Sequence, residues 1–226
     1  MNSIKAVLFD LDNTLLDRQT AFLQVAQAFY NSYAAVGGRH TQEEVVSLLV
    51  SWDAFGTAPR HAFERALDAW PDIGISTCEM MGWYYDELCK AIKPDKRALA
   101  LVADLNKEGL PWGVVTNGSA VQHAKVKVAG VGNMAPFVIV SSDFGHSKPE
   151  PPIFQEALRR LGAIPAENTL FVGDNPDTDI KGAQAVGMQT AWVRLGRHFP
   201  EHLPPPDHEV DHVVDLRPII LGSGTL

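Results

Sequence analysis

Two aspartates, Asp10 and Asp12, follow a short apolar run near the start of the chain. The run covers residues 6–9 and has the composition of a strand that is buried on both faces of a parallel sheet. Two carboxylates at the carboxyl end of such a strand can face one crevice and hold one cation. The alternative is a polar turn that merely ends a core strand.

Polar residues of the types that phosphoryl transfer needs also follow three further predicted strands. They are Thr116 and Asn117 after the strand 112–116, Lys148 in the loop after the strand 137–141, and Asp174, Asp177 and Asp179 after the strand 169–173. The carboxyl ends of parallel strands share one edge of the sheet, so we expect these residues to converge on Asp10 and Asp12.

The order of predicted elements indicates how these residues are held in place. Strands alternate with helices after residue 94, and a fifth strand is predicted over 189–193. Residues 17–94 instead carry the apolar stripes of four amphipathic helices. We therefore predict an α/β fold: a Rossmann-like parallel sheet core with helices on both faces, residues 1–16 and 95–226, plus an inserted four-helix-bundle cap, residues 17–94.

Local patterns predict several element ends. Three pairs have the spacing of a capping box at a helix start, and they are Thr41 with Glu44, Ser76 with Glu79, and Ser119 with Gln122. A last short strand is predicted near residues 212–214. The four histidines at 198, 202, 208 and 212 are spaced like metal pairs, but the prolines between them favour a solvated loop.

Composition narrows the possible partners. The net charge of −8 argues against a broad nucleic-acid surface, and no apolar run approaches the length of a membrane span. Cys78 and Cys89 fall in one predicted helix, too far apart for a disulfide. We expect a cytoplasmic protein, monomer or homodimer, that binds no nucleic-acid polymer and no membrane.

Four motifs resemble, in order, those of the haloacid dehalogenase superfamily, and of its phosphatase branches in particular. They are FDLDNT, VVTNGS, SKPEPPIF and GDNPDTDIKGAQAVGM. The resemblance covers the whole chain and includes a helical cap between the first two motifs. FDLDNTLLD and VTNGS look most like the branch that holds nucleotidases and phosphoglycolate-type phosphatases.

This resemblance implies a role for each candidate residue. Asp10 would be the nucleophile that forms an aspartyl-phosphate, and Asp12 would protonate the leaving group and later deprotonate water. Thr116 and Asn117 would bind the phosphate, with Lys148 supplying positive charge. A hard oxygen site suits Mg²⁺ as cofactor. Its protein ligands would be Asp10, Asp174 and the backbone carbonyl of Asp12.

Of the remaining residues, Asp179 and Arg18 keep two interpretations each. Asp179 matches the last acid of the fourth motif, and it would touch the metal through water or only orient Lys148. Asp177 is interpreted as a helix cap. Arg18 would reach the substrate from the hinge or lie on the surface.

The leading hypothesis is therefore a Mg²⁺-dependent phosphatase acting on a small phosphorylated metabolite. A 2-haloacid dehalogenase is an alternative, but halide needs no proton donor, so Asp12 argues against it. A sugar phosphomutase would keep the same acids, and a non-catalytic binding protein would keep only the fold.

Overall fold

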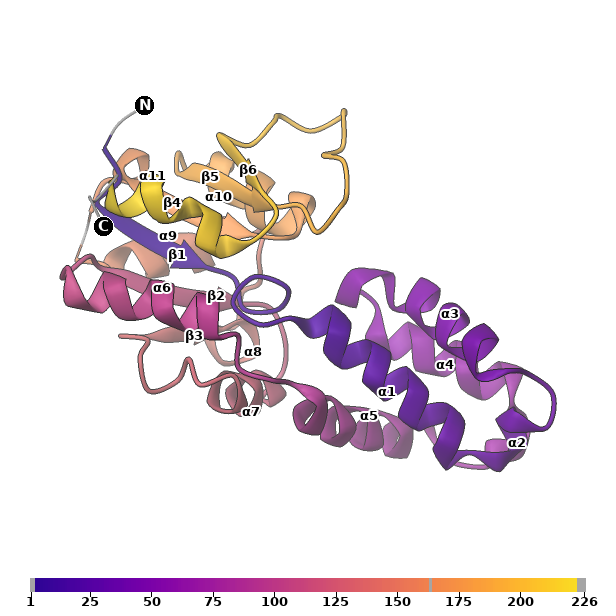
Figure 1. Cartoon of the computed structure of the whole chain (residues 1–226). Helices are drawn as coiled ribbons and strands as arrows, with labels where there is room; N and C mark the ends of the chain where they lie inside the picture. Colours follow the sequence, from indigo (N-terminus) through magenta and orange to yellow (C-terminus); the bar gives the residue numbers. More distant parts are fainter. Residues whose placement is uncertain (1–2, 163, 223–226) are drawn as a thin grey trace. The chain divides into compact units, whose positions relative to one another are not determined.

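The computed structural model describes residues 3–162 and 164–222 and divides the chain into two compact units (Figure 1). One unit comprises Met1–Leu16 and Pro94–Leu226, and the other comprises Asp17–Lys93. The chain leaves the first unit after β1 and returns to it before α6, so the second unit is an insertion. Within the described residues, no helix combines the length and apolar character needed to cross a membrane.

The first unit is built on a sheet of six parallel strands, as the α/β prediction requires. The order in the sheet is β3-β2-β1-β4-β5-β6, so the chain runs outward from β1 in both directions. The order therefore reverses between β1 and β4, where open α/β sheets place their ligands. The strands are β1 Ala6–Phe9, β2 Trp112–Thr116, β3 Val138–Val140, β4 Thr169–Gly173, β5 Gln189–Val193 and β6 His208–Val210.

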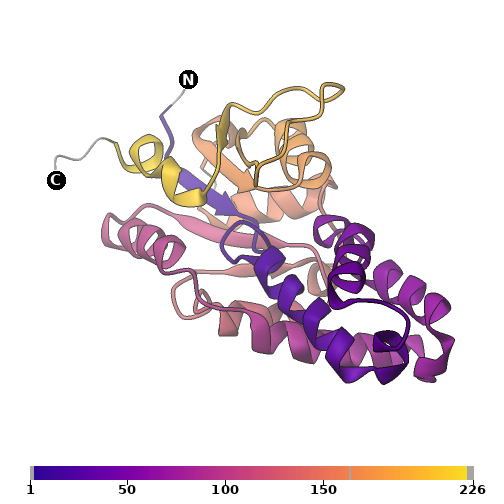
Figure 2. The same cartoon turned by 45° about the vertical axis from the view of Figure 1, so that its right-hand side comes forward.

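Helices lie on both faces of this sheet (Figures 1 and 2). All four residues of β1 are buried, and successive side chains of a strand point to opposite faces. Ala6 and Leu8 therefore share one face, where they belong to the same buried cluster as Phe154 of α9 and Ala183 of α10. The helices of the unit are α6 Lys96–Lys107, α7 Val121–Val128, α8 Ser141–Phe144, α9 Pro151–Arg160, α10 Lys181–Ala185 and α11 Arg217–Leu221.

The second unit is helical, and aromatic rings fill its interior. Phe63 lies 6.2 Å from Phe22, 5.9 Å from Phe29 and 5.0 Å from Tyr84, measured between ring centroids. Rings in such edge-to-face and tilted contacts stabilise a core beyond the area that they bury. The helices of the unit are α1 Arg18–Ser32, α2 Ala34–Gly37, α3 Gln42–Asp53, α4 Pro59–Ala69 and α5 Thr77–Ala91.

The capping boxes predicted at Thr41 and Ser76 are confirmed, with both reciprocal hydrogen bonds present in each. The third predicted box is wrong. Helix α7 starts after Ala120 without a side-chain cap, because Gln122 turns inward to other partners. The strand predicted near 212–214 is also wrong: β6 lies earlier, and a 3₁₀ turn, Val213–Leu216, follows His212.

Candidate active site

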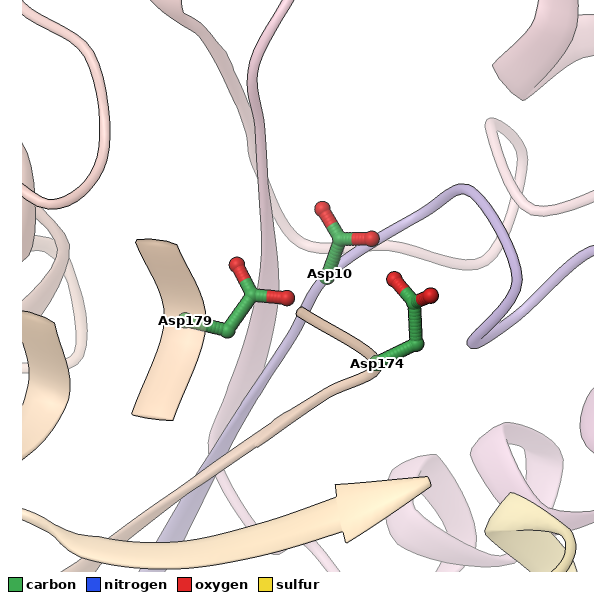
Figure 3. Close-up of side chains that lie close together, drawn as sticks. All are labelled: Asp10, Asp174 and Asp179. Carbon is green, nitrogen blue, oxygen red and sulfur yellow. The ribbon is translucent and has the colours of Figure 1, made fainter. Parts of the chain in front are cut away.

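Three carboxylates from two neighbouring strand ends meet at the carboxyl edge of the sheet. Asp10 follows β1 and Asp174 follows β4, and the Asp10 backbone N–H donates to the Val172 carbonyl at 2.8 Å. One carboxylate oxygen from each of Asp10, Asp174 and Asp179 lies within 4.8 Å of the other two (Figure 3). All three side chains are buried, so their charges need compensation within the protein.

Asp179 reaches this cluster because the chain after β4 is shaped around it. The residue sits in a π-helical turn, Pro176–Ile180, and its Oδ2 accepts the Asn175 backbone N–H at 3.0 Å. A Cβ on Gly173 would lie 2.3 Å from the same oxygen, so only glycine fits there. The turn is capped by Asn175, whose Oδ1 accepts the N–H of Asp177 at 3.0 Å, so the cap predicted at Asp177 is wrong.

Lys148 places its ammonium between two of the carboxylates. Its Nζ lies 2.5 Å from Asp10 Oδ1 and 2.7 Å from Asp179 Oδ1. The Asn117 side chain holds the Lys148 backbone in place, donating to its carbonyl and accepting its N–H, both at 2.8 Å. Asp179 thus contacts Lys148 directly, and both of its predicted roles stay predictions.

Burial sets the protonation behaviour of this cluster. Burial raises the pKa of Asp10 well above its ordinary value, while the charge of Lys148 opposes that rise. Burial raises the pKa of Asp174 to about 7, helped by the charge of Asp179. Burial alone would lower the pKa of Lys148, but Asp10 and Asp179 hold it above its ordinary value. Lys148 therefore stays protonated, and the buried negative charge of the carboxylates attracts a further cation.

The Asp12 carboxylate contacts a different lysine from the one that contacts Asp10 and Asp179. The loop after β1 curls back, with the Leu11 carbonyl accepting the N–H groups of Leu15 and Leu16 and with Asn13 at φ 60°. The Asp12 carboxylate, 21% exposed, lies 2.8 Å from the Lys125 ammonium on α7. The predicted metal role of Asp12 concerned its backbone carbonyl, and it stays a prediction.

Residues 4–187 match the family described as hydrolase, haloacid dehalogenase-like hydrolase. The chain belongs to this family.

Curated relatives of this haloacid dehalogenase-like hydrolase match it over almost its full length. It is 32% identical to a glyceraldehyde 3-phosphate phosphatase from Methanopyrus kandleri, covering 96% of this chain and 97% of the relative. It is 33% identical to an N-acetylmuramic acid 6-phosphate phosphatase from Pseudomonas aeruginosa, covering 94% and 93%. The chain is accordingly an enzyme of the phosphoric monoester hydrolase class.

Solved structures share the fold at lower identity. A haloacid dehalogenase-type phosphatase from Thermococcus onnurineus superposes with a TM-score of 0.69 at 24% identity, covering 98% of this chain and 100% of that one. An L-2-haloacid dehalogenase from Xanthobacter autotrophicus gives a TM-score of 0.74 at 22% identity, with the same coverage. The fold is thus shared by phosphatases and dehalogenases, and it does not separate the two activities.

The acidic cluster of this hydrolase has the chemistry of a divalent-cation site. Its donors are carboxylate oxygens, which hard cations such as Mg²⁺ prefer. Lys148 contacts Asp10 and Asp179, and a second cation, Arg197, contacts Asp174. Three buried carboxylates thus face two basic side chains, and a divalent ion would offset the remaining negative charge.

Arg197 is a site residue that the sequence did not indicate. It lies in the loop after β5, and its Nη2 donates to the Asp174 carbonyl at 2.7 Å and to Asp174 Oδ2 at 3.0 Å. Its guanidinium also lies 5.6 Å from the centre of the Trp192 ring. A loop has no helical or strand periodicity that could indicate a role for one of its arginines. The contacts of Arg197 with Asp174 are therefore seen only in the structure.

The raised pKa of Asp174 predicts a pH dependence of stability in the metal-free protein. Between the ordinary carboxyl pKa of 3.8 and about 7, the folded chain keeps a proton that the unfolded chain releases. The stability that this group contributes is therefore complete below that window and is lost as pH rises through it. We expect the melting temperature in chelator to fall from about pH 5 to about pH 8, and to fall less in Asp174→Asn. Parallel curves for the two proteins would contradict this assignment.

Arg18 is not on the surface, so that interpretation is wrong. Its guanidinium donates to both carboxylate oxygens of Asp53, at 2.6 and 2.7 Å, and to the Tyr84 hydroxyl at 2.8 Å. A Cβ on Gly56 would lie 2.8 Å from Arg18 Nη1, so the turn after α3 closes tightly over the pair. These bonds join α1, α3 and α5 within the helical unit. The substrate contact predicted for Arg18 stays a prediction.

Proposed function

We propose that this chain is a Mg²⁺-dependent phosphatase that hydrolyses a small phosphomonoester through an aspartyl-phosphate on Asp10. The observation that carries the proposal is the setting of Asp10, whose buried carboxylate has Lys148 at 2.5 Å and Asp174 and Asp179 beside it. Lys148 and a divalent ion beside Asp10 can bind a phosphate dianion that the Asp10 carboxylate alone would repel.

In the first step, a carboxylate oxygen of Asp10 attacks phosphorus and the bond to the leaving oxygen breaks. Asp12 gives its proton to that oxygen, so the alcohol leaves neutral. Lys148 contacts Asp10 and carries a positive charge where the transferred group gains negative charge. The product is an acyl phosphate on Asp10 and a free alcohol.

In the second step, water attacks the same phosphorus and the bond to the Asp10 oxygen breaks. Asp12, now a carboxylate, takes a proton from that water, which restores both aspartates and releases inorganic phosphate. Thr116, at the end of β2, is assigned to a phosphate oxygen together with the backbone N–H of Asn117.

The predicted ligands of the ion are Asp10, Asp174 and the backbone carbonyl of Asp12, and Asp179 is close enough to take part. When bound, Mg²⁺ supplies positive charge that offsets repulsion between the phosphate oxygens and the carboxylates. Arg197 holds Asp174 through its backbone carbonyl as well as through one carboxylate oxygen, so this ligand is fixed in place before the ion binds.

The proposed substrate is a phosphorylated metabolite of the size of a sugar phosphate or a phosphorylated short-chain acid or aldehyde. The relatives named for glyceraldehyde 3-phosphate and for N-acetylmuramic acid 6-phosphate both act on such compounds. A panel of phosphorylated metabolites that includes these two esters, nucleotides and phosphoglycolate ranks the candidates by kcat/KM.

The proposal is tested by phosphate release from p-nitrophenyl phosphate with Mg²⁺ and with chelator. We expect turnover only with the metal, and loss of that turnover on chelation should reverse when Mg²⁺ is restored. Chloride release from a 2-chloroacid without ester hydrolysis would assign the dehalogenase reaction instead. Transfer of phosphate between two positions of a sugar would assign a mutase, and no turnover of any of these would leave a binding protein.

Mg²⁺ should also stabilise the folded chain, whatever the substrate. An ion that binds only the folded state adds about 2.7 kcal/mol of stability at one hundred times its Kd. We expect Mg²⁺ to raise the melting temperature of the wild type and to leave that of Asp174→Asn nearly unchanged. Asp177→Asn is the matched control, because Asp177 is an exposed acid of the same loop. Equal shifts in all three proteins would exclude Asp174 as a ligand.

A further inference from the structure

Helix α7 turns two long polar side chains inward onto Asp12. Lys125 Nζ lies 2.9 and 2.8 Å from the two carboxylate oxygens of Asp12. Gln122 Nε2 donates to Asp12 Oδ2 at 3.0 Å and to the Thr116 hydroxyl at 2.5 Å. Lysine and glutamine are mostly exposed in proteins, yet Lys125 is 5% and Gln122 is 2% exposed here.

The local backbone is arranged to allow these contacts. Gln122 and Lys125 are three residues apart on a helix and therefore share one face. Gly118, in the turn that leads from β2 to α7, has φ 151°, and a Cβ there would lie 2.7 Å from Gln122 Cγ. Any larger residue at this turn would push Gln122 away from both of its partners.

The two reacting carboxylates thus have separate lysines. Lys148 contacts Asp10 and Asp179, and Lys125 contacts Asp12. Gln122 links the Asp12 carboxylate to the Thr116 hydroxyl, so the proton-transfer group and the group assigned to the phosphate keep a fixed relation. With 21% of its side chain exposed, Asp12 is still open to a leaving group.

We propose that Lys125 and Gln122 are positioning residues that hold the Asp12 carboxylate in the orientation for proton transfer. This inference rests on the proposed function, because it assigns Asp12 to that transfer. A general acid acts only within about 2.6–3.2 Å of the oxygen that it protonates, and displacement by about 1 Å costs about a hundredfold in rate. The contacts from Lys125 and Gln122 limit the positions that the Asp12 side chain can take.

A positioning role for Lys125 and Gln122 predicts a result that differs from the result expected if they only stabilise the fold. An ester with a poor leaving group needs the proton from Asp12, whereas p-nitrophenolate leaves readily without it. A variant that misplaces Asp12 should therefore lose kcat/KM mainly on the poor leaving group, since kcat/KM reports the first phosphoryl transfer. A variant that only loosens the fold should lose the same factor on both esters.

The experiment compares phenyl phosphate with p-nitrophenyl phosphate in the Mg²⁺-loaded enzyme. For Lys125→Met we expect kcat/KM on phenyl phosphate to fall by about tenfold or more relative to the fall on p-nitrophenyl phosphate. Gln122→Met should change the ratio of kcat/KM on the two esters in the same direction but by less. If Lys125→Met does not fold, Gln122→Met tests the positioning role in its place. Lys127→Met, an exposed lysine of the same helix, is the control and should leave the ratio unchanged.

A double variant shows whether Lys125 acts through Asp12. In an Asp12→Asn background the proton donor is absent, so adding Lys125→Met should lower kcat/KM on phenyl phosphate no further. Equal losses on the two esters, or additive losses in the double variant, would overturn the positioning role alone. A wild type that hydrolyses neither ester would overturn the proposed function and this role with it.

Discussion

Asp10→Asn should reduce phosphomonoester hydrolysis by a factor on the order of 10⁶, the scale at which loss of an enzymic nucleophile is measured. The amide has the shape of the carboxylate but cannot form the acyl phosphate. Burial already raises the pKa of Asp10 well above its ordinary value, so the uncharged amide suits this position. The variant loses one of the two ion pairs of Lys148 but keeps the contact with Asp179, so we expect it to fold with a melting temperature near that of the wild type.

The measurement is phosphate release together with mass spectrometry of the acid-quenched enzyme. The wild type should carry a phosphoryl group on the peptide that contains Asp10, and the variant should carry none. Asp177→Asn controls for the loss of one acidic charge at the same edge of the sheet, because Asp177 is exposed. A variant that retains substantial turnover, or a phosphoryl group found on another residue, would remove Asp10 from its role.

The convergence of Asp10 and Asp174 could be predicted because it follows from the parallel sheet. Each residue comes directly after a buried apolar strand, and all carboxyl ends of a parallel sheet lie along one edge. The neighbouring position of β1 and β4 was not predictable in this way, because strand order depends on how the helices pack and not on the strands themselves. The structure shows β1 between β2 and β4, which brings these two aspartates together.

Several contacts made from helices escaped prediction for a different reason. Ser119 and Gln122 have the spacing of a capping box, and the same spacing places Gln122 on the inner face of α7. A local pattern cannot distinguish these outcomes, because the partners of Gln122 are Asp12 and Thr116, which belong to other segments. Likewise, nothing near Arg18 in sequence indicates Asp53, which lies 35 residues away.

Lys148→Met should lower both activity and stability. Removing the ammonium leaves Asp10 and Asp179 without the cation that contacts both, and breaking a buried ion pair on one side costs about 3–5 kcal/mol. Loss of a charge that faces the transferred group should lower kcat by about 10²–10³. Lys181→Met, at an exposed lysine, is the control. Denaturant unfolding in chelator and phosphate release with Mg²⁺ measure the two effects separately.

A second substitution separates these two effects on physical grounds. In Lys148→Met/Asp179→Asn, one positive and one negative charge are removed together, so part of the lost stability should return, because only Asp10 is then left without its cation. Activity should not return, because the phosphate still lacks the lysine charge next to Asp10. Recovery of both properties would show that Lys148 only balances buried charge. Recovery of stability alone is the result that a role in phosphate transfer requires.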